Sequence, residues 1–293
     1  MNLNQTKIDW KSRERRKRRV RKLAEEIVDA THPPQAPIDI FALIDSEYPL
    51  LKVRGANLGN LFDGQLEYHP GRNRFLLFYN SKYDEATGGD RDSQHPRTRF
   101  SIAHELGHYF IDSHREFLLS GGQAHKSKGE FSTSNLVEVE ADCFAAGLLT
   151  PTKLLSPLIN RSELSFSVIE QLAQKFNVSV VSAAISSVQM SDYPCALVAL
   201  NQGRIKWQSL SPPLLEAGCY PNYGATPKHL PSLWEKVSSG SVGLSERNSS
   251  RIDSWFNTYD NYRLGSCYFE ETYFSVPVME TLLVLLAADE KDI

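Results

Sequence analysis

The five-residue motif His104-Glu105-Leu106-Gly107-His108 is the most informative stretch of this chain, because it indicates both a helix and a metal site. Histidines four residues apart fall on the same face of a helix, so His104 and His108 can bind one metal ion together. Glu105 lies one residue further round, where its carboxylate can take a proton from metal-bound water. Apolar residues lead into and out of the motif, which indicates a helix with a buried back. The motif therefore predicts a hydrolytic zinc site with Glu105 as its base.

A zinc hydrolase needs a third protein ligand, and the first candidate is His114. It completes the spacing His-Glu-x-x-His-x5-His, which is the ligand pattern of the metzincins. That pattern needs a glycine at position 111, where the helix breaks, and this chain has Ile111. On an unbroken helix at about 100° per residue, His114 points roughly 80° from His104 and about 120° from His108. We therefore expect His114 to be a helix-end or surface histidine.

Glu138 is the better candidate for the third ligand. It opens the run Glu138-Val139-Glu140-Ala141-Asp142, which continues into the apolar residues 143–146. Glu138 and Asp142 are four residues apart and share a helix face, whereas Glu140 points about 200° away from Glu138. We expect Glu138 to bind the metal, with Glu140 as the fallback ligand. Asp142 should accept a hydrogen bond from the free ring N–H of a ligand histidine.

Together the two motifs resemble those of the ImmA/IrrE family of metallo-endopeptidases, which are zincin-like enzymes of bacteria and phages. The resemblance rests on residues 99–108 and 138–151 and extends roughly over residues 15 to 185. It implies a zinc cofactor, and the ligands and base that it implies are His104, His108, Glu138 and Glu105. Better-known members cleave a helix-turn-helix repressor, so a regulatory protein is the implied substrate. The family often has asparagine at the position of Asp142, and nothing here resembles the DNA-binding domain fused to some members.

Length and composition limit the class of protein. The 293 residues are enough for a catalytic domain and a smaller second domain, and the net charge of −3 gives no overall attraction to nucleic acid. No stretch approaches the ~20 apolar residues that span a bilayer, and the start of the chain lacks the apolar core of a signal peptide. Four scattered cysteines without zinc-knuckle spacing indicate reduced thiols. We expect a cytoplasmic protein with neither a membrane nor a nucleic-acid partner, in an oligomeric state that the sequence leaves open.

The N-terminal part predicts helices and a small sheet. Residues 10–29 form a helical pattern whose first half is very basic; such a run can bind phosphate backbones but is more often a solvated face. A short helix should start near residue 38. Three strands are expected before the metal-binding motif, at residues 51–53, 64–68 and 74–79, the last two joined by a turn. This is the zincin arrangement of a small twisted sheet beside the metal-binding helix.

Two polar segments, residues 84–96 and 121–134, are predicted as loops at the rim of the active site. Residues 166–188 resemble a helix-turn-helix pair, with Asn177 at the turn and Ser179 as the N-cap of the second helix. A helix that reads DNA needs polar residues early, whereas residues 180–185 are mostly apolar. We therefore expect this pair to pack against the catalytic domain.

The character of the chain changes near residue 190. Residues 196–199 and 204–208 flank Asn201-Gln202-Gly203 and predict a β-hairpin, and residues 268–278 are strand-like. The predicted fold is therefore α+β, with a zincin-like catalytic domain at residues 1–189 and a smaller α+β domain at residues 190–293. The second domain could sense a ligand, recognise the substrate or cap the protease.

Two functional hypotheses follow. The first is a cytosolic zinc endopeptidase that cleaves a regulatory protein, such as a repressor encoded nearby. The second is a transcription regulator or protein-binding module in which the metal site is structural. The intact Glu105 favours the first, because a structural site needs no base beside its ligands.

Overall fold

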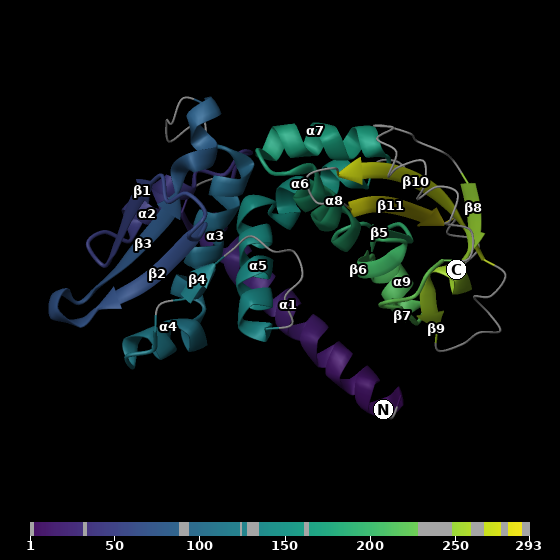
Figure 1. Cartoon of the computed structure of the whole chain (residues 1–293), viewed down its shortest axis with the longest axis horizontal. Coiled ribbons are helices and arrows are strands. Elements are labelled where there is room, and N and C mark those ends of the chain that lie inside the picture. Colours follow the sequence, from purple (N-terminus) through teal and green to yellow (C-terminus); the bar gives the residue numbers. More distant parts are fainter. Residues whose placement is uncertain are drawn as a thin grey trace. The chain divides into compact units, whose positions relative to one another are not determined.

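The computed structural model describes residues 3–31, 34–87, 94–123, 125–127, 135–160, 164–227, 248–258, 267–276 and 281–288 (Figure 1). The chain divides into two compact units. The first comprises Met1–Leu154 and Ala173–Ser179, and the second comprises Leu155–Leu172 and Val180–Ile293. The mixture of helices and small sheets confirms the predicted α+β class. The division differs from a boundary after residue 189, because most of the helical segment before that residue groups with the C-terminal strands.

The sheet of the first unit has four described strands, β1 (Leu51–Ala56), β2 (Gly64–His69), β3 (Arg74–Asn80) and β4 (His125–Ser127). Their order is β1-β3-β2-β4, with β1 parallel to β3 and the other neighbours antiparallel. The first three are the predicted strands. Between β2 and β3, the 3-10 helix η1 (Pro70–Arg72) and Asn73, at φ 43°, form the predicted turn.

Strand β4 corrects the prediction of a loop over residues 121–134. Its three residues pair with the first half of β2, with Ser127 opposite Gly64. Residues 121–123 are described and form no helix or strand, whereas residues 124 and 128–134 of that predicted loop lie outside the described residues. The other predicted loop begins as the 3-10 helix η2 (Ser81–Thr87), and its residues 88–93 also lie outside them.

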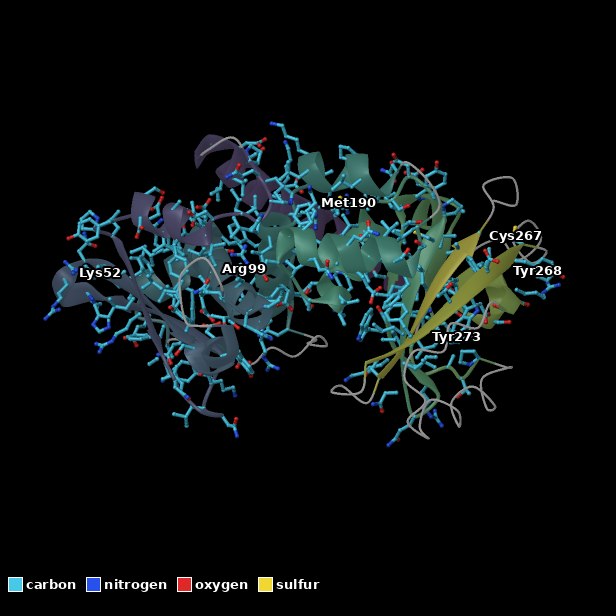
Figure 2. All side chains as sticks on the ribbon, turned by 90° about the horizontal axis from the view of Figure 1, so that it is seen from above. Lys52, Arg99, Met190, Cys267, Tyr268 and Tyr273 are labelled. Atoms are coloured by element: carbon cyan, nitrogen blue, oxygen red, sulfur yellow. The ribbon has the colours of Figure 1, made fainter. Side chains whose placement is uncertain are left out.

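The first unit also contains five described helices: α1 (Leu3–Thr31), α2 (Ile40–Ser46), α3 (Pro96–Phe110), α4 (Asp112–Leu119) and α5 (Leu136–Leu149). α3 packs on β2 and β3, where alternate strand residues such as Leu66 and Leu77 are buried. α5 packs against both α3 and α1. Arg99 of α3, labelled in Figure 2, is buried and donates a hydrogen bond to the Ile38 carbonyl at 2.7 Å. Burial lowers the pKa of Arg99 to about 10.

Helix α1 follows the predicted amphipathic pattern. Val20, Ala24 and Val28 are buried, and the basic residues of its first half are mostly exposed. Arg21 is the exception, because its guanidinium is buried and donates to the Thr150 carbonyl at 2.6 Å. This bond satisfies a carbonyl beyond the end of α5 and ties α1 to it.

The second unit is a five-stranded antiparallel sheet with helices and a two-stranded sheet. Its strand order is β6-β5-β11-β10-β8, made of β5 (Cys195–Asn201), β6 (Arg204–Leu210), β8 (Asn248–Arg251), β10 (Tyr268–Val276) and β11 (Thr281–Ala288). The predicted hairpin joins β5 to β6 through Gln202 and Gly203, which have φ of 48° and 74° as a two-residue turn of this kind requires. The remaining described elements, of which α6 and α7 belong partly to the first unit, are α6 (Thr152–Ile159), α7 (Phe166–Phe176), α8 (Val180–Gln189), α9 (Pro212–Glu216), β7 (Cys219–Pro221), η3 (Ile252–Ser254) and β9 (Phe256–Thr258).

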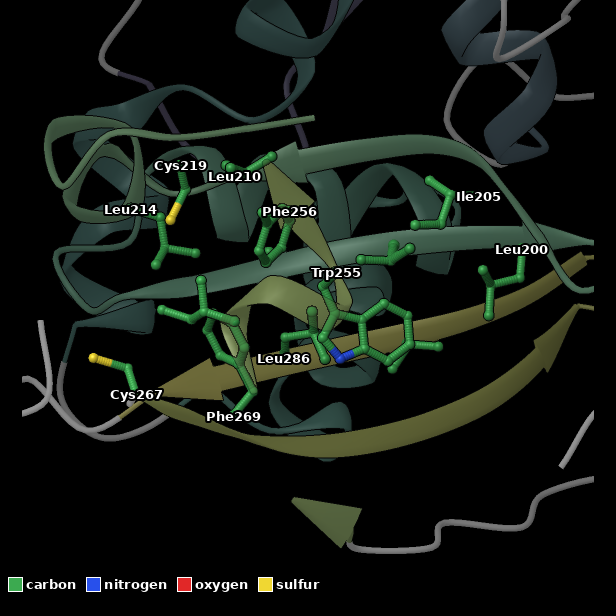
Figure 3. Packing of buried hydrophobic residues seen from close by; sticks show 14 of the residues in the cluster. Leu200, Ile205, Leu210, Leu214, Cys219, Trp255, Phe256, Cys267, Phe269 and Leu286 are labelled. Carbon is green, nitrogen blue, oxygen red and sulfur yellow. The ribbon is translucent and has the colours of Figure 1, made fainter. Parts of the chain in front are cut away.

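A hydrophobic core lies on one face of the five-stranded sheet. Figure 3 shows Trp255 and Phe256 beside strand residues such as Leu200 and Leu286, and all four are buried. Alternate residues of β5 belong to this core, yet the residues between them are buried as well. The opposite face of β5 is therefore covered too, and α8 packs against β5 and β6.

The helix-turn-helix-like pair forms as predicted, with Asn177 in the turn at φ 50°. Its packing was predicted only in part. The end of α7 and the turn group with the first unit, where the Asn177 side chain donates to the Gln94 carbonyl at 3.1 Å. α8 instead groups with the second unit, and its residues Val181, Ala183 and Ala184 are buried. The expectation that the pair packs against the catalytic domain therefore stays a prediction for α8, which packs on β5 and β6 of the second unit.

Among the described helices, none combines the length and the apolar character needed to cross a membrane.

Candidate metal centre

Helix α3 presents His104, Glu105 and His108 from its buried turns. The helix starts where Pro96 occupies a first-turn position, which suits a residue without an N–H, and the His95 ring accepts from the Arg97 N–H at 3.1 Å. His104 and His108 are 5% and 4% exposed, and Glu105 is fully buried. Because such polar groups are rarely buried without partners, the interior of this unit must supply their interactions.

Helix α5 brings Glu138 and Asp142 to the same place. Its N-cap is Asn135, whose side chain accepts a hydrogen bond from the Val137 N–H at 3.1 Å. Glu138 and Asp142 are four residues apart and face α3 together, as the helical spacing predicts. The Glu138 side chain is only 12% exposed.

The donor atoms of the three predicted ligands form a small triangle. His104 Nε2 lies 3.2 Å from His108 Nε2 and 3.3 Å from Glu138 Oε2, and His108 Nε2 lies 3.6 Å from Glu138 Oε1. Donors bound tetrahedrally to zinc at its usual ligand distances are about 3.3 Å apart. Two imidazoles and a carboxylate are also a common catalytic zinc set. The residues present therefore fit a zinc ion, and these three are the group that could hold a metal within the described chain.

Asp142 orients one of these histidines. Its Oδ1 lies 2.9 Å from His104 Nδ1, which leaves Nε2 of the same ring for the metal. Burial by itself would lower the pKa of His104, but the Asp142 and Glu138 carboxylates, together with Glu105, raise it to about 10. Three carboxylates around one ring therefore favour a cation at this position.

Glu105 lies beside the donor triangle and is not one of its three members. Burial raises the pKa of its carboxyl to about 7, although the charge of His104 and a hydrogen bond from Ser127 oppose this shift. The Ser127 hydroxyl donates to Glu105 Oε1 at 2.6 Å. A carboxylate whose pKa lies near neutrality is suited to accept a proton and release it again.

Gly107, inside the histidine motif, lets α3 and α5 approach closely. A Cβ at this position would lie 3.1 Å from the Ala141 Cα and 3.2 Å from the Ala141 carbonyl oxygen. Both contacts are with the backbone of α5, which could give way only if the helix moved. The short approach brings Glu138, one turn earlier on α5, within reach of the two histidines.

His114 was predicted as a helix-end or surface histidine; it does lie in the first turn of α4, but it is buried and not at the surface. α3 ends at Phe110, and Ile111 adopts an extended conformation with ψ 112°, so the chain turns into α4 although it has no glycine there. This break leaves His114 5% exposed, with its ring centroid 5.1 Å from that of His108. The surface prediction failed because it assumed an unbroken helix.

His114 and Glu140 form an ion pair with each other, and neither belongs to the group of three side chains that could hold a metal. His114 Nε2 lies 3.2 Å from Glu140 Oε2, and Arg16 of α1 donates to Glu140 Oε1 at 2.6 Å. Burial lowers the pKa of His114 despite its carboxylate neighbour. Both alternative ligands are therefore engaged in a polar cluster that joins α1, α4 and α5.

Two residues near Glu105 were missed by the sequence analysis. Ser127 lies in a segment predicted as loop, and no pattern marks it. Gly64 begins a predicted strand, where a glycine signals close approach of another group. A Cβ on Gly64 would lie 2.7 Å from Glu105 Oε1, so the missing side chain makes room for this carboxylate.

A helical unit with a small sheet and an HExxH helix facing a second acidic helix defines a zincin-like protein. The IrrE N-terminal-like domain model of peptidase family M78 matches residues 90–186, which include both motifs. This match confirms the predicted resemblance to the ImmA/IrrE family for that part of the chain, and it identifies a metallopeptidase-like domain. Among curated proteins, no sequence matches the chain.

The fold also has a counterpart among solved structures. A Mycobacterium tuberculosis transcriptional regulator matches with a TM-score of 0.56 at 14% sequence identity. The match covers 94% of this chain and 77% of that one. At this identity the likeness concerns the fold alone, and it extends over both units.

Proposed function

We propose that this chain is a zinc-dependent endopeptidase that cleaves another protein. The observation that carries the proposal is the triangle of His104, His108 and Glu138 donor atoms, at 3.2–3.6 Å from one another, beside the buried carboxylate of Glu105. A structural zinc site closes its coordination with four protein ligands, whereas a catalytic one uses three. Three ligands and an adjacent base therefore favour catalysis.

Each residue has a distinct part in the proposed hydrolysis. A bound zinc ion supplies Lewis-acid chemistry, polarising the scissile carbonyl and acidifying a water molecule. Glu105 accepts the proton of the attacking water and later donates it to the leaving amine. Asp142 holds the ring of His104 in the orientation that its bond to the metal requires.

The proposed substrate is a regulatory protein, with a helix-turn-helix repressor as the leading candidate. The peptidase-family match supports a protein substrate, and the resemblance to ImmA/IrrE members supports a repressor. An exposed, flexible inter-domain segment is the expected cleavage site, because a zincin-like site takes an extended peptide. The proposed compartment is the cytoplasm, which the four free cysteines support.

A transcription regulator with a structural metal is less well supported. The second helix of the helix-turn-helix-like pair, α8, buries Val181, Ala183 and Ala184, so those side chains are not available to base edges. A purely structural metal site also needs no buried carboxylate beside its ligands, so it does not account for the position of Glu105.

The deciding experiment compares the wild type with Glu105→Gln, both loaded with zinc. The variant should retain zinc and its fold, because Glu105 is not one of the three ligands. Cleavage should fall by ~10²–10⁴-fold or more, because a carboxamide cannot accept the proton of water. Candidate repressors encoded nearby would be incubated with each protein, and mass spectrometry would look for a single cut. A Glu105→Gln protein that cuts at the wild-type rate would contradict the proposed mechanism.

A further inference from the structure

The carboxylate of Glu105 has two oxygens in different environments. Oε1 accepts the Ser127 hydroxyl at 2.6 Å, a short bond of the kind formed with a charged acceptor. Oε2 is buried and has no hydrogen-bond partner among the described residues. Burying a carboxylate oxygen without a hydrogen bond costs free energy, unless a bound ligand or water molecule donates a hydrogen bond to it. The Leu66 backbone N–H also acts on this carboxyl. Ser127 is the side chain that anchors Oε1, and no described side chain anchors Oε2.

Ser127 is itself fixed by the sheet. Its backbone carbonyl accepts from the Asp63 N–H at 2.9 Å, and its residue pairs with Gly64 in the β2–β4 register. Its side chain is buried, and the hydroxyl lies 3.2 Å from the Gly64 carbonyl as well. The hydroxyl therefore approaches Glu105 from a strand whose position the backbone of β2 determines.

Asp63 connects this strand back to the start of α3. Its Oδ2 accepts from the guanidinium of Arg97 at 2.8 Å, and its Oδ1 accepts from the Tyr83 hydroxyl at 3.2 Å. Arg97 and Glu105 lie on the same helix. Asp63 thus links α3, which carries Glu105, to β4, which carries Ser127, and fixes their relative positions.

Gly64 completes the arrangement from the opposite strand. A Cβ there would lie 2.7 Å from Glu105 Oε1 and 3.1 Å from Ser127 Oγ. The carboxylate and the hydroxyl can meet only because this position has no side chain. An alanine would displace the flexible end of Glu105 at small cost to the fold.

We propose that Ser127 is a positioning residue that holds Glu105 Oε1. Oε2 is then the oxygen that accepts the proton of an acid bound at the metal, which is water in the proposed reaction and acetohydroxamate in the test below. This inference rests on the proposed function and extends it to a residue outside both metal-binding motifs. Ser127 would not contact the substrate. It would act by keeping the base in one rotamer, which spares the reaction the cost of ordering that side chain.

The test uses full-length protein loaded with Co²⁺ and acetohydroxamate as a small metal-binding acid, so that no natural substrate is needed. The visible spectrum of cobalt reports binding of the metal and of the probe separately. Ser127→Ala should leave cobalt binding unchanged and weaken acetohydroxamate roughly tenfold, the order expected for one charge-assisted hydrogen bond. Glu105→Gln should weaken the probe at least as much. Ser127→Thr keeps the hydroxyl and should restore the wild-type affinity.

Two further variants sharpen the result. Gly64→Ala should also weaken the probe while cobalt stays bound, because the new methyl group displaces the carboxylate and not a ligand. Ser101→Ala is the matched control, since Ser101 is a buried serine of α3 whose hydroxyl donates to the Arg97 carbonyl and not to Glu105. Its probe affinity should equal that of the wild type.

The inference is overturned if Ser127→Ala binds acetohydroxamate as tightly as the wild type, or if it loses cobalt together with the probe. A wild-type spectrum that acetohydroxamate leaves unchanged would overturn it as well. Failure of the proposed function would look different, because the wild type would then bind no cobalt or His104→Ala would bind it equally well.

Discussion

At the scale of single residues, the choice of the third ligand depends on which carboxylate of α5 points toward α3. Glu138 and Glu140 are two residues apart, so they point to different sides of the helix. Glu138 lies within 3.3–3.6 Å of the two histidines of α3, whereas Glu140 interacts with Arg16 and His114. The local geometry thus supports the proposal that Glu138 binds the metal, and it places Glu140 in a polar cluster with Arg16 and His114.

A mutational series can test this assignment. Glu138→Gln should weaken zinc binding far more than Glu140→Gln or His114→Ala, because only Glu138 places an oxygen in the donor triangle. Asp142→Ala should act more mildly, with a loss on the order of 10- to 100-fold in affinity for a residue that orients a ligand. Competition with a chromogenic chelator would measure each affinity. If His114→Ala alone removed the metal, the metzincin-like ligand set would be correct.

At the scale of elements, helix α5 is held between two close helix contacts. Gly107 lets α3 approach on one side, and Gly147 lets α1 approach on the other. A Cβ on Gly147 would lie 2.8 Å from the Arg21 carbonyl oxygen, a backbone atom of α1 that has little freedom to move. Small residues at both contacts therefore set the position of the helix that carries Glu138.

Gly147→Ala should destabilise the protein. Alanine is the better helix former by about 1 kcal/mol, but overpacking against α1 costs about 1–3 kcal/mol, so the net change should lower the free energy of unfolding. Urea denaturation followed by circular dichroism would measure it. Gly71→Ala is a suitable control, because a Cβ there meets nothing within 4 Å. An unchanged or higher denaturation midpoint for Gly147→Ala would show that the α1–α5 contact can relax.

At the scale of the whole molecule, the metal site lies in the first of the two units. All three proposed ligands belong to Met1–Leu154. The free energy of metal binding therefore adds to the free energy of unfolding of the first unit. The second unit has its own core around Trp255 and Phe269 and none of these ligands. Metal binding should consequently affect the two units unequally.

Zinc should raise the thermal midpoint of the first unit. At a free zinc concentration 100 times the dissociation constant, the gain is about 2.7 kcal/mol, which corresponds to about 5–10 °C for a unit of this size. Differential scanning calorimetry with zinc and with EDTA would measure the shift. A protein carrying both His104→Ala and His108→Ala should show none. An equal shift in that variant would place the bound zinc elsewhere.

The sequence by itself determined the features that depend on spacing along one helix. His104 and His108 share a face because they are four residues apart, and so do Glu138 and Asp142. The strands before α3 and the hairpin at Gln202 were predicted for the same reason, since local period and turn chemistry need no distant partner. The family resemblance rested instead on the two motifs at residues 99–108 and 138–151. The fold class and that resemblance are confirmed by the structure and by the match over residues 90–186.

Only the tertiary structure decided the contacts that join distant segments. Ser127 meets Glu105 because β4 pairs with β2, and a polar stretch of sequence carries no sign of that register. His114 is buried because the chain turns at Ile111 without a glycine, which packing can impose and helical periodicity cannot reveal. The packing of α8 on β5 and β6 was also decided by the tertiary structure. The sequence shows that α8 has an apolar face, but because the hydrophobic effect is not directional, the sequence does not show which surface covers that face.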